Sequence, residues 1–237
     1  MTDTKTILFL TTQLPYPPVS GGVIKSWKLV EHLASQHRLR VIAMLKGQDA
    51  EHEGAFQEAV ALDRYHGAAL DVPRTGLNWL KSLLLSDCLN AYRNRLPALQ
   101  ARVDEWAQDA DMIFVDHYEM FQYVPKHFTG KVVFHEHNAE YVMWQRFSAL
   151  ETRPLHKAIL AIEARRIRKA EARYANRADL TLAAPNDIEA LAPHCQPGTR
   201  FEVTYHLGDD TLLDRPPVAF SQTTESLLLV GTPYLGS

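Results

Sequence analysis

Two short polar segments of this 237-residue sequence carry side chains that can transfer protons or bind polar ligands. Asp116 and His117 directly follow the apolar residues 112–115, and residues 135–140 (His-Glu-His-Asn-Ala-Glu) directly follow the apolar residues 131–134. An imidazole exchanges its proton near neutral pH, so it can act as a general base or as a hydrogen-bond donor. Each segment can also be an ordinary polar loop, and the elements that precede them decide whether the two segments meet.

The second segment also allows a metal-binding interpretation. Alternation along a strand directs His135 and His137 to the same side, and two histidines with a carboxylate near His117 resemble a ligand set. No other set of similarly spaced ligands recurs in the sequence, which weakens that interpretation. We therefore predict that no metal binds and that residues 135–140 contact a substrate, with Asn138 also suited to cap the following helix.

A glycine pair lies between the first apolar run and the first helical pattern. Residues 7–10 predict a buried strand, and residues 13–22, with three prolines and two glycines, cannot be helical throughout. Gly21 and Gly22 would bring backbone N–H groups and a helix N-terminus to the carboxyl edge of a sheet, which suits a phosphate or sugar group. A turn in which one glycine adopts a positive φ explains the pair equally well. The dinucleotide motif G-x-G-x-x-G does not follow this strand.

Short apolar runs alternate with helical patterns along most of the chain. Continuously apolar strands in such an alternation predict a Rossmann-like α/β fold, with a parallel sheet and helices on both faces. The predicted strands are residues 7–10, 39–45, 68–72, 112–115, 131–134, 180–183 and 200–205. The predicted helices are residues 23–33, 77–85, 97–107, 139–147, 155–178 and 185–192.

This architecture would bring the polar segments together. Each of them follows a predicted strand at its carboxyl end, and parallel strands align those ends along one edge of the sheet. We therefore expect the candidate residues to converge at that edge; they are Gly21, Gly22, His117, His135 and His137.

The composition is that of an ordinary globular protein. Apolar residues make up 46% and charged residues 22%, and the net charge of −3 gives no general attraction to nucleic acid. Cys88 and Cys195 are the only cysteines, so no disulfide framework is indicated and a reducing compartment is expected. No apolar run approaches the ~20 residues that span a bilayer. Because the N-terminus leads directly into the first strand, we expect a cytoplasmic protein.

The predicted helix at residues 155–178 carries many basic residues. Besides Glu163 and Glu171 it contains Lys157, Arg165, Arg166, Arg168, Lys169, Arg173 and Arg177. A solvated face with acidic partners four positions away explains them. A basic surface that contacts an anionic membrane or a lipid phosphate explains them as well, so peripheral contact with the inner face of the membrane stays open.

The composition changes near residue 207. Residues 208–226 are rich in Gly, Pro, Asp, Ser and Thr, which predicts an exposed interdomain linker. Residues 227–230 are again continuously apolar, like the strand at residues 7–10 that begins the first domain. We expect one domain at residues 1–207 and, at residues 227–237, the first strand of a truncated C-terminal domain.

Together these segments resemble the N-terminal domain of a glycosyltransferase of the GT-B fold, specifically the family-4 group of retaining enzymes. The residues that carry the resemblance are the loop at 15–22, the strand and histidine at 111–117, His137-Asn138-Ala139-Glu140 with Arg146, and residues 178–187. Their order and spacing are more specific than any single segment. The chain departs from the family pattern at Pro185, where serine is usual, and at residues 205–213, which replace the usual linker.

The resemblance implies a cleft between two Rossmann-like domains, with this chain on the acceptor side. Gly21 and Gly22 would meet the donor diphosphate through backbone amides, and His117 would lie beside the reacting sugar as the catalytic residue. The fold generally requires no divalent metal, and no cofactor is expected besides the nucleotide-sugar substrate. The residues expected to bind the acceptor are Tyr16, Tyr118, His135, His137, Asn138 and Glu140, although the aromatic rings also suit core positions.

The resemblance also implies an activity. A sugar would pass from a nucleotide-sugar to a sugar, lipid-linked or glycan acceptor, in bacterial polysaccharide or glycoconjugate synthesis. The family's donor-contacting E-x(7)-E segment would lie beyond Ser237, so this chain alone is expected to be inactive. The alternative is a non-catalytic Rossmann-like binding module or accessory subunit. The apolar residues 227–230 favour the first hypothesis, because a free-standing module does not need the first strand of a second domain.

Overall fold

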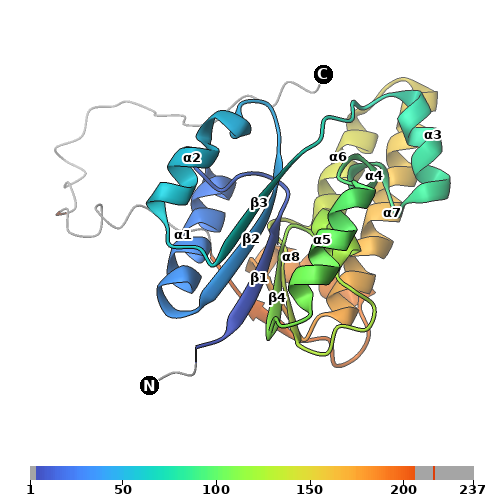
Figure 1. Cartoon of the computed structure of the whole chain (residues 1–237). Helices are drawn as coiled ribbons and strands as arrows, with labels where there is room; N and C mark the ends of the chain where they lie inside the picture. Colours follow the sequence, from blue (N-terminus) through green and yellow to red (C-terminus); the bar gives the residue numbers. More distant parts are fainter. Residues whose placement is uncertain (1–3, 206–215, 217–237) are drawn as a thin grey trace. The chain divides into compact units, whose positions relative to one another are not determined.

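The centre of the protein is a parallel sheet of seven strands (Figure 1). The computed structural model describes residues 4–205 and Pro216. Across the sheet the strands follow the order β3-β2-β1-β4-β5-β6-β7, and every neighbouring pair is parallel. The strands are β1 (Thr6–Thr11), β2 (Arg38–Leu45), β3 (Arg64–Ala69), β4 (Met112–Asp116), β5 (Lys131–His135), β6 (Leu180–Ala183) and β7 (Phe201–Val203).

Helices cover both faces of this sheet. One face packs against α1 (Gly21–Gln36) and α2 (Asp49–Ala59). The other packs against α5 (Pro97–Ala107), α6 (Glu140–Leu150) and α7 (Pro154–Arg177). The remaining helical elements are α3 (Gly76–Leu85), α4 (Leu89–Arg93), α8 (Pro185–Leu191) and the 3-10 turns η1 (Tyr118–Tyr123) and η2 (Ala192–His194). Within the described residues no helix has both the length and the apolar character required to cross a bilayer.

The central strands are buried on both faces, which explains why their sequences are continuously apolar. All six residues of β1 and seven of the eight residues of β2 are buried. On the α1 side, Phe9 of β1 stacks on Phe114 of β4 with ring centroids 5.1 Å apart. On the other side, Phe121 stacks on Tyr174 of α7 at 4.7 Å. The predicted α/β class, with a parallel sheet covered on both faces, is confirmed.

The edge of the sheet departs from the sequence prediction. β3 begins at Arg64 and ends at Ala69, whereas a strand is predicted at residues 68–72. Ala68 is its one buried residue, so this edge strand lacks the apolar run that marks the central strands. The sequence pattern also misses α2 and α4, because α2 buries only Phe56 and α4 spans only five residues.

Two predicted features fall on residues that the structure does not describe. The linker predicted at residues 208–226 lies outside the described range except for Pro216, and so does the strand predicted at residues 227–237. The domain boundary therefore stays a prediction.

The single buried side chain of α2 provides a test of how that helix is held. Phe56 has no exposed surface and lies edge-to-face against Trp27 at 6.1 Å and Tyr65 at 5.3 Å. Phe56→Ala removes this anchor and leaves a cavity, so we expect a loss of about 3–5 kcal/mol of unfolding free energy in urea titrations. The control Glu58→Ala, at an exposed position of α2, should change it by less than about 0.5 kcal/mol. Equal effects of the two substitutions would contradict this account.

Candidate functional site

Three neighbouring strands end in a row of polar side chains at the carboxyl edge of the sheet. Thr11 ends β1, Asp116 ends β4 and His135 ends β5, and strand pairing places Asp116 opposite both of the others. The order of the strands reverses here, because the chain builds outward from β1 to one side and then returns to add β4 on the other. Ligands of open α/β sheets bind at such a reversal point. The row therefore marks the candidate functional site.

The Asp116 carboxylate is fully buried and accepts hydrogen bonds from side chains of four residues. Its Oδ1 atom accepts from His135 Nδ1 at 2.7 Å and from His137 Nε2 at 2.6 Å. Its Oδ2 atom accepts from the hydroxyl groups of Ser26 at 2.7 Å and Thr11 at 3.0 Å. Hydrogen bonds to a carboxylate stabilise its charged form. One buried anion thus connects β1, α1, β4 and the segment that follows β5.

Burial and mutual charges set the protonation of this cluster. Burial raises the pKa of Asp116, but the neighbouring histidines, His137 and then His117, outweigh it and hold that pKa well below its usual range. Burial lowers the pKa of His137 to about 3 and also lowers that of His135, although Asp116 opposes both shifts. Both imidazoles are therefore neutral at pH 7, and each donates its single N–H to Asp116. This leaves His137 Nδ1 and His135 Nε2 as acceptors.

His117 is the strained member of the cluster. Among the described residues it is the only non-glycine residue with positive φ, at 79°, a conformation that costs on the order of 1–3 kcal/mol. Its ring stacks on that of His137 with centroids 3.7 Å apart, and its Nδ1 lies 3.4 Å from Asp116 Oδ2. Burial lowers the pKa of His117, but the Asp116 charge outweighs burial and raises it. The His117 side chain is 21% exposed and that of His137 7%, so His117 is the imidazole of this pair that a ligand can reach more readily.

Helix α1 begins beside this pair of rings. Gly21 and Gly22 are its first two residues, and the N-cap residue Ser20 makes no side-chain hydrogen bond to the helix. A Cβ atom on Gly22 would lie 3.9 Å from His137 Nδ1, so the start of α1 lies against the His117–His137 stack. Uncapped N–H groups and the helix dipole favour an anion at this position. Neither glycine has positive φ, so the turn interpretation is wrong.

The helix that follows β5 is capped by a distant side chain and not by Asn138. Asn138 is exposed, and the N-cap position belongs to Ala139. The Ala139 N–H group donates to Asp187 Oδ1 at 2.9 Å. The predicted capping role of Asn138 is therefore wrong, because a carboxylate from the first turn of α8 already satisfies a free donor at the start of α6.

The residues predicted to bind an acceptor differ in accessibility. Tyr118 is buried in the core with its hydroxyl 3.6 Å from Cys88 Sγ, so it cannot stack on a sugar and that prediction is wrong. His135 is also fully buried, so the structure contradicts direct contact with an acceptor and gives it a role through the Asp116 carboxylate. Tyr16 is half-buried, with its ring against Trp27 at 5.1 Å.

A second group of carboxyls lies near Glu136, which follows β5 and stands between the two histidines in sequence, so alternation directs it away from them. Glu136 is buried, and so is Glu171 of α7. Burial, and after it repulsion between carboxyls, raises the pKa of both well above the usual range. Glu140, the first residue of α6, is half-buried, and burial together with Glu119 raises its pKa to about 7. Of these acids, Glu140 is the one that titrates near neutral pH.

Asp116, His135 and His137 are the one group of described residues whose ligand atoms are close enough to share a metal ion. Their separations fit hydrogen bonds better. The two N···O distances are 2.6 and 2.7 Å, whereas two ligands of a tetrahedral zinc ion are about 3.3 Å apart. The absence of a bound metal stays a prediction, and this geometry supports it.

Sequence reasoning misses three side chains of the site. Thr11 and Ser26 bond to Asp116, and Lys25 is buried beside them with no hydrogen-bond partner for Nζ among the described residues. Burial lowers the pKa of Lys25 despite the attraction of nearby carboxylates. The available signal is spacing, because Ser26 follows Gly22 by four positions and lies on the same helical face. Nothing in the local sequence marks Thr11.

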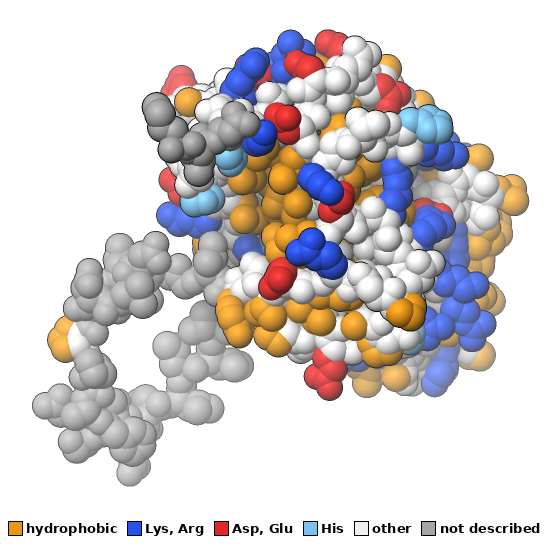
Figure 2. Space-filling model, turned by 90° about the horizontal axis from the view of Figure 1, so that it is seen from below, with side chains coloured by type: hydrophobic (Ala, Val, Ile, Leu, Met, Phe, Trp, Pro, Cys, Tyr) orange, Lys and Arg blue, Asp and Glu red, His pale blue; other side chains and the backbone are white. Residues whose placement is uncertain are grey.

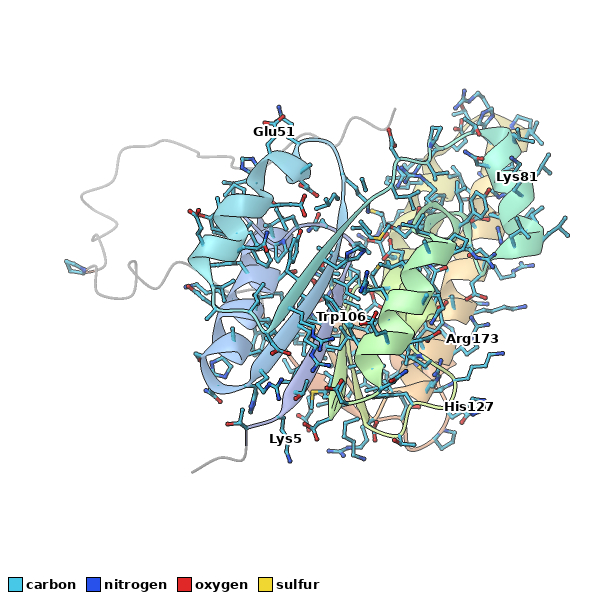
Figure 3. All side chains as sticks on the ribbon, viewed as in Figure 1. Lys5, Glu51, Lys81, Trp106, His127 and Arg173 are labelled. Carbon is cyan, nitrogen blue, oxygen red and sulfur yellow. The ribbon has the colours of Figure 1, made fainter. Side chains whose placement is uncertain are left out.

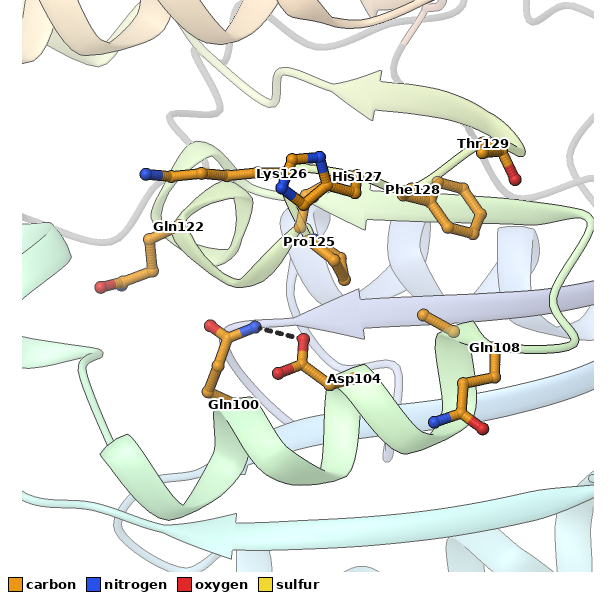
Figure 4. A pocket seen from close by; sticks show the side chains of 11 residues that line it. Gln100, Asp104, Gln108, Gln122, Pro125, Lys126, His127, Phe128 and Thr129 are labelled. Carbon is orange, nitrogen blue, oxygen red and sulfur yellow. Dashed lines mark hydrogen bonds between the residues drawn. The ribbon is translucent and has the colours of Figure 1, made fainter.

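A pocket of about 590 Å³ lies away from this cluster (Figure 4). Residues of α5 and residues between 122 and 129, which precede β5, form its walls. Gln100 donates to Asp104 Oδ1 at 2.9 Å and to Tyr123 O at 3.0 Å. None of the predicted site residues lines this pocket.

Comparison with known proteins finds distant structural neighbours. No family model matches the chain, and no curated protein matches it. One similar solved structure is Phytolacca americana UGT2 complexed with UDP-2fluoro-glucose and pterostilbene, at 11% identity and TM-score 0.49, covering 92% of this chain and 58% of that one. An Arabidopsis thaliana UGT complexed with UDP has 12% identity and TM-score 0.46, with 86% and 50% covered. A Polygonum tinctorium UDP-glucosyltransferase complexed with 3,4-dichloroaniline has 10% identity and TM-score 0.49, with 91% and 56% covered. The chain thus spans 50–58% of the length of these solved chains.

The Asp116–His117 pair should govern how stability depends on pH. The low folded-state pKa of Asp116 contributes stability above the unfolded value of about 3.9, and this is lost as the pH falls toward the folded value. The raised pKa of His117 contributes fully below about 6.5, and this is lost as the pH rises through the folded value. We therefore expect Asp116→Asn to cost about 3 kcal/mol of unfolding free energy near pH 6 and less at pH 3 or pH 9.

The measurement is urea unfolding of both proteins over that pH range. The matched control is Asp104→Asn on the exposed side of α5, which should stay within about 0.5 kcal/mol of the unsubstituted protein throughout. A penalty for Asp116→Asn that does not vary with pH would show that the charge pair is not the source of the stability.

Proposed function

We propose that residues 1–207 are the acceptor-side half of a nucleotide-sugar glycosyltransferase of the GT-B type. One observation carries the proposal: the uncapped start of α1, at Gly21 and Gly22, lies against His137, on which the His117 ring stacks, at the reversal point of the sheet. A helix N-terminus next to an accessible cation suits the diphosphate of a nucleotide-sugar. The motif resemblance in residues 15–22 and 111–117 is independent support for the same assignment.

The proposed reaction exchanges one bond at the anomeric carbon of the sugar for another. The bond from that carbon to the diphosphate oxygen breaks, a bond to the acceptor oxygen forms, and the proton of the acceptor hydroxyl is released. Negative charge grows on the departing diphosphate. The α1 amides and the His117 imidazolium would lie where this charge develops, and fixed donors of this kind lower the barrier. Retention of configuration and the bacterial polysaccharide setting rest on the family-4 resemblance.

The protonation of His117 decides its role in this proposal. Because Asp116 raises the pKa of His117, this proposal assigns the ring the role of a cation and hydrogen-bond donor, and not that of a general base. Asp116 is a positioning residue that keeps this charge in place. The positive φ of His117 holds the ring against Asp116 and His137, so strain is retained where the ligand would bind. Among the predicted acceptor contacts, Tyr16, Asn138 and Glu140 remain accessible.

The 237-residue chain by itself should not transfer sugar. It offers one wall of the cleft, and the nucleotide would stay in contact with water without the donor-binding domain that the resemblance implies. We expect no turnover with UDP-, GDP- or ADP-glucose, and calorimetry should give dissociation constants above about 1 mM for each. Robust transfer by this chain alone would mean that the donor site lies within it and would overturn the assignment of an acceptor half.

A protein that carries a donor-binding domain after residue 237 should show the role of His117 directly. His117→Ala should lower kcat by about 100-fold or more with an unchanged circular dichroism spectrum, because one fixed donor to the leaving group is lost. The control His127→Ala removes an exposed imidazole beside the distant pocket and should leave kcat unchanged. Acceptor binding without transfer in the longer protein would favour the accessory-module alternative.

A further inference from the structure

Exposed apolar side chains gather on the outer sides of α3 and α7. On α3, Leu77, Leu80 and Leu84 are exposed, Leu84 at 89%, and their spacing of three and four residues places them on one face. On α7, Leu155 and Ile162 are exposed and lie two helical turns apart on one face. Large apolar side chains that gather on a surface mark a site of interaction with another molecule or a membrane.

The exposed charges of these two helices are all positive. The exposed basic residues are Lys81 on α3 and Lys157, Arg165, Lys169, Arg173 and Arg177 on α7. α7 contains two acidic residues, Glu163 and Glu171, and both are buried, whereas α3 contains none. The exposed bases of α7 therefore have no acidic partner within the helix, which corrects the prediction of partners four positions away; the salt bridge within α7 joins Glu163 to Arg166, three positions on. We call the exposed leucine, isoleucine and basic residues of α3 and α7 the docking surface.

Direct contacts hold the two helices together, so their exposed faces adjoin. Trp79 Nε1 donates to Glu163 Oε1 at 2.8 Å, and Arg166 Nη2 donates to Ser82 O at 2.7 Å. Lys81 and Arg173 project on the same side of the protein in Figure 3. In Figure 2, which keeps the left–right placement of Figure 1, basic and hydrophobic side chains lie together along that side.

A small polar pocket adjoins the exposed stripe of α7. It has a volume of about 240 Å³ and lies between α6 and α7, with Ser148, Arg165 and Arg168 among its lining residues. Neither arginine forms a salt bridge with another residue in the range 4–205. Guanidinium groups bind phosphate oxygens in a bidentate manner, so two unpaired arginines in one pocket suit a phosphate group.

We propose that the docking surface attaches this protein to a membrane that contains anionic phospholipid. Leucine side chains of α3 would enter the headgroup boundary, while the basic side chains of α7 contact lipid phosphates, as in helices that lie in the plane of a membrane. A protein partner fits less well, because the cores of protein interfaces are depleted in charged residues and enriched in aromatic ones. On α3 and α7, Trp79 is half-buried and Tyr174 is buried, while Lys157 and Lys169 are exposed. The inference does not depend on sugar transfer.

Vesicle co-sedimentation of the 237-residue chain tests this proposal. We expect binding to vesicles of phosphatidylcholine with about 30% phosphatidylglycerol, no binding to phosphatidylcholine alone, and release at high salt. Arg165→Gln with Lys169→Gln should weaken binding about 30-fold, since each basic residue contributes about fivefold. Leu80→Ser with Leu84→Ser should weaken it at least about fivefold. Both pairs are exposed, so circular dichroism should be unchanged.

The matched control is Arg200→Gln with Lys126→Gln, which removes the same charge from exposed positions outside α3 and α7 and should bind like the unsubstituted chain. Equal loss in this control would reduce the effect to net charge and overturn the proposal. Absence of binding to the anionic vesicles, or equal binding to both lipid mixtures, would also overturn it. So would a dimer in light scattering that Leu80→Ser with Leu84→Ser abolishes, because the surface would then join two copies of the chain.

Discussion

The buried negative charge of Asp116 is the constraint on which the candidate site depends. A carboxylate without contact to water is costly unless hydrogen bonds satisfy it. Four side chains do so, from β1, from α1, from the end of β5 and from the residue two positions beyond it. The same bonds therefore hold these elements in register and choose the tautomers of two histidines. Removal of the charge would leave its partners buried and unsatisfied, so site geometry and local stability have one cause.

That anion also separates two chemical environments along residues 135–137, at and just after the end of β5. His135 and His137 face Asp116, whereas Glu136 between them faces the side of α7, where Glu171 is buried. On the first side burial lowers the pKa of two imidazoles, and the carboxylate raises the pKa of His117. On the second side burial, and after it repulsion between carboxyls, raises the pKa of Glu136 and Glu171. Alternation along this segment thus places a partly accessible site around a carboxylate next to an interior that disfavours negative charge.

α7 shows the same division around a helix. Its buried side carries both of its acidic residues, and Glu163 accepts from Trp79 of α3 and pairs with Arg166. Its exposed side carries only bases and apolar groups. Burial of the acids consequently leaves an outer surface more positive than the helix sequence suggests. The proposed transfer site and the proposed docking surface both arise because the fold hides one sign of charge and exposes the other.

The sequence by itself determined the parallel α/β architecture, because strands buried on both faces must be continuously apolar. It also determined that the glycine pair and the three histidines gather at one edge, since parallel strands align their carboxyl ends. The sequence did not predict α2, which buries one side chain. It also did not predict the hydrogen bonds of Thr11 and Ser26 to Asp116, because these residues lie 105 and 90 positions from it. Only the tertiary structure decided that Tyr118 is a core residue and that His117 is the more accessible of the two stacked imidazoles. The accessibility and the pKa of a side chain depend on which distant groups pack around it. The spacing of residues within a short stretch of sequence does not reveal that packing.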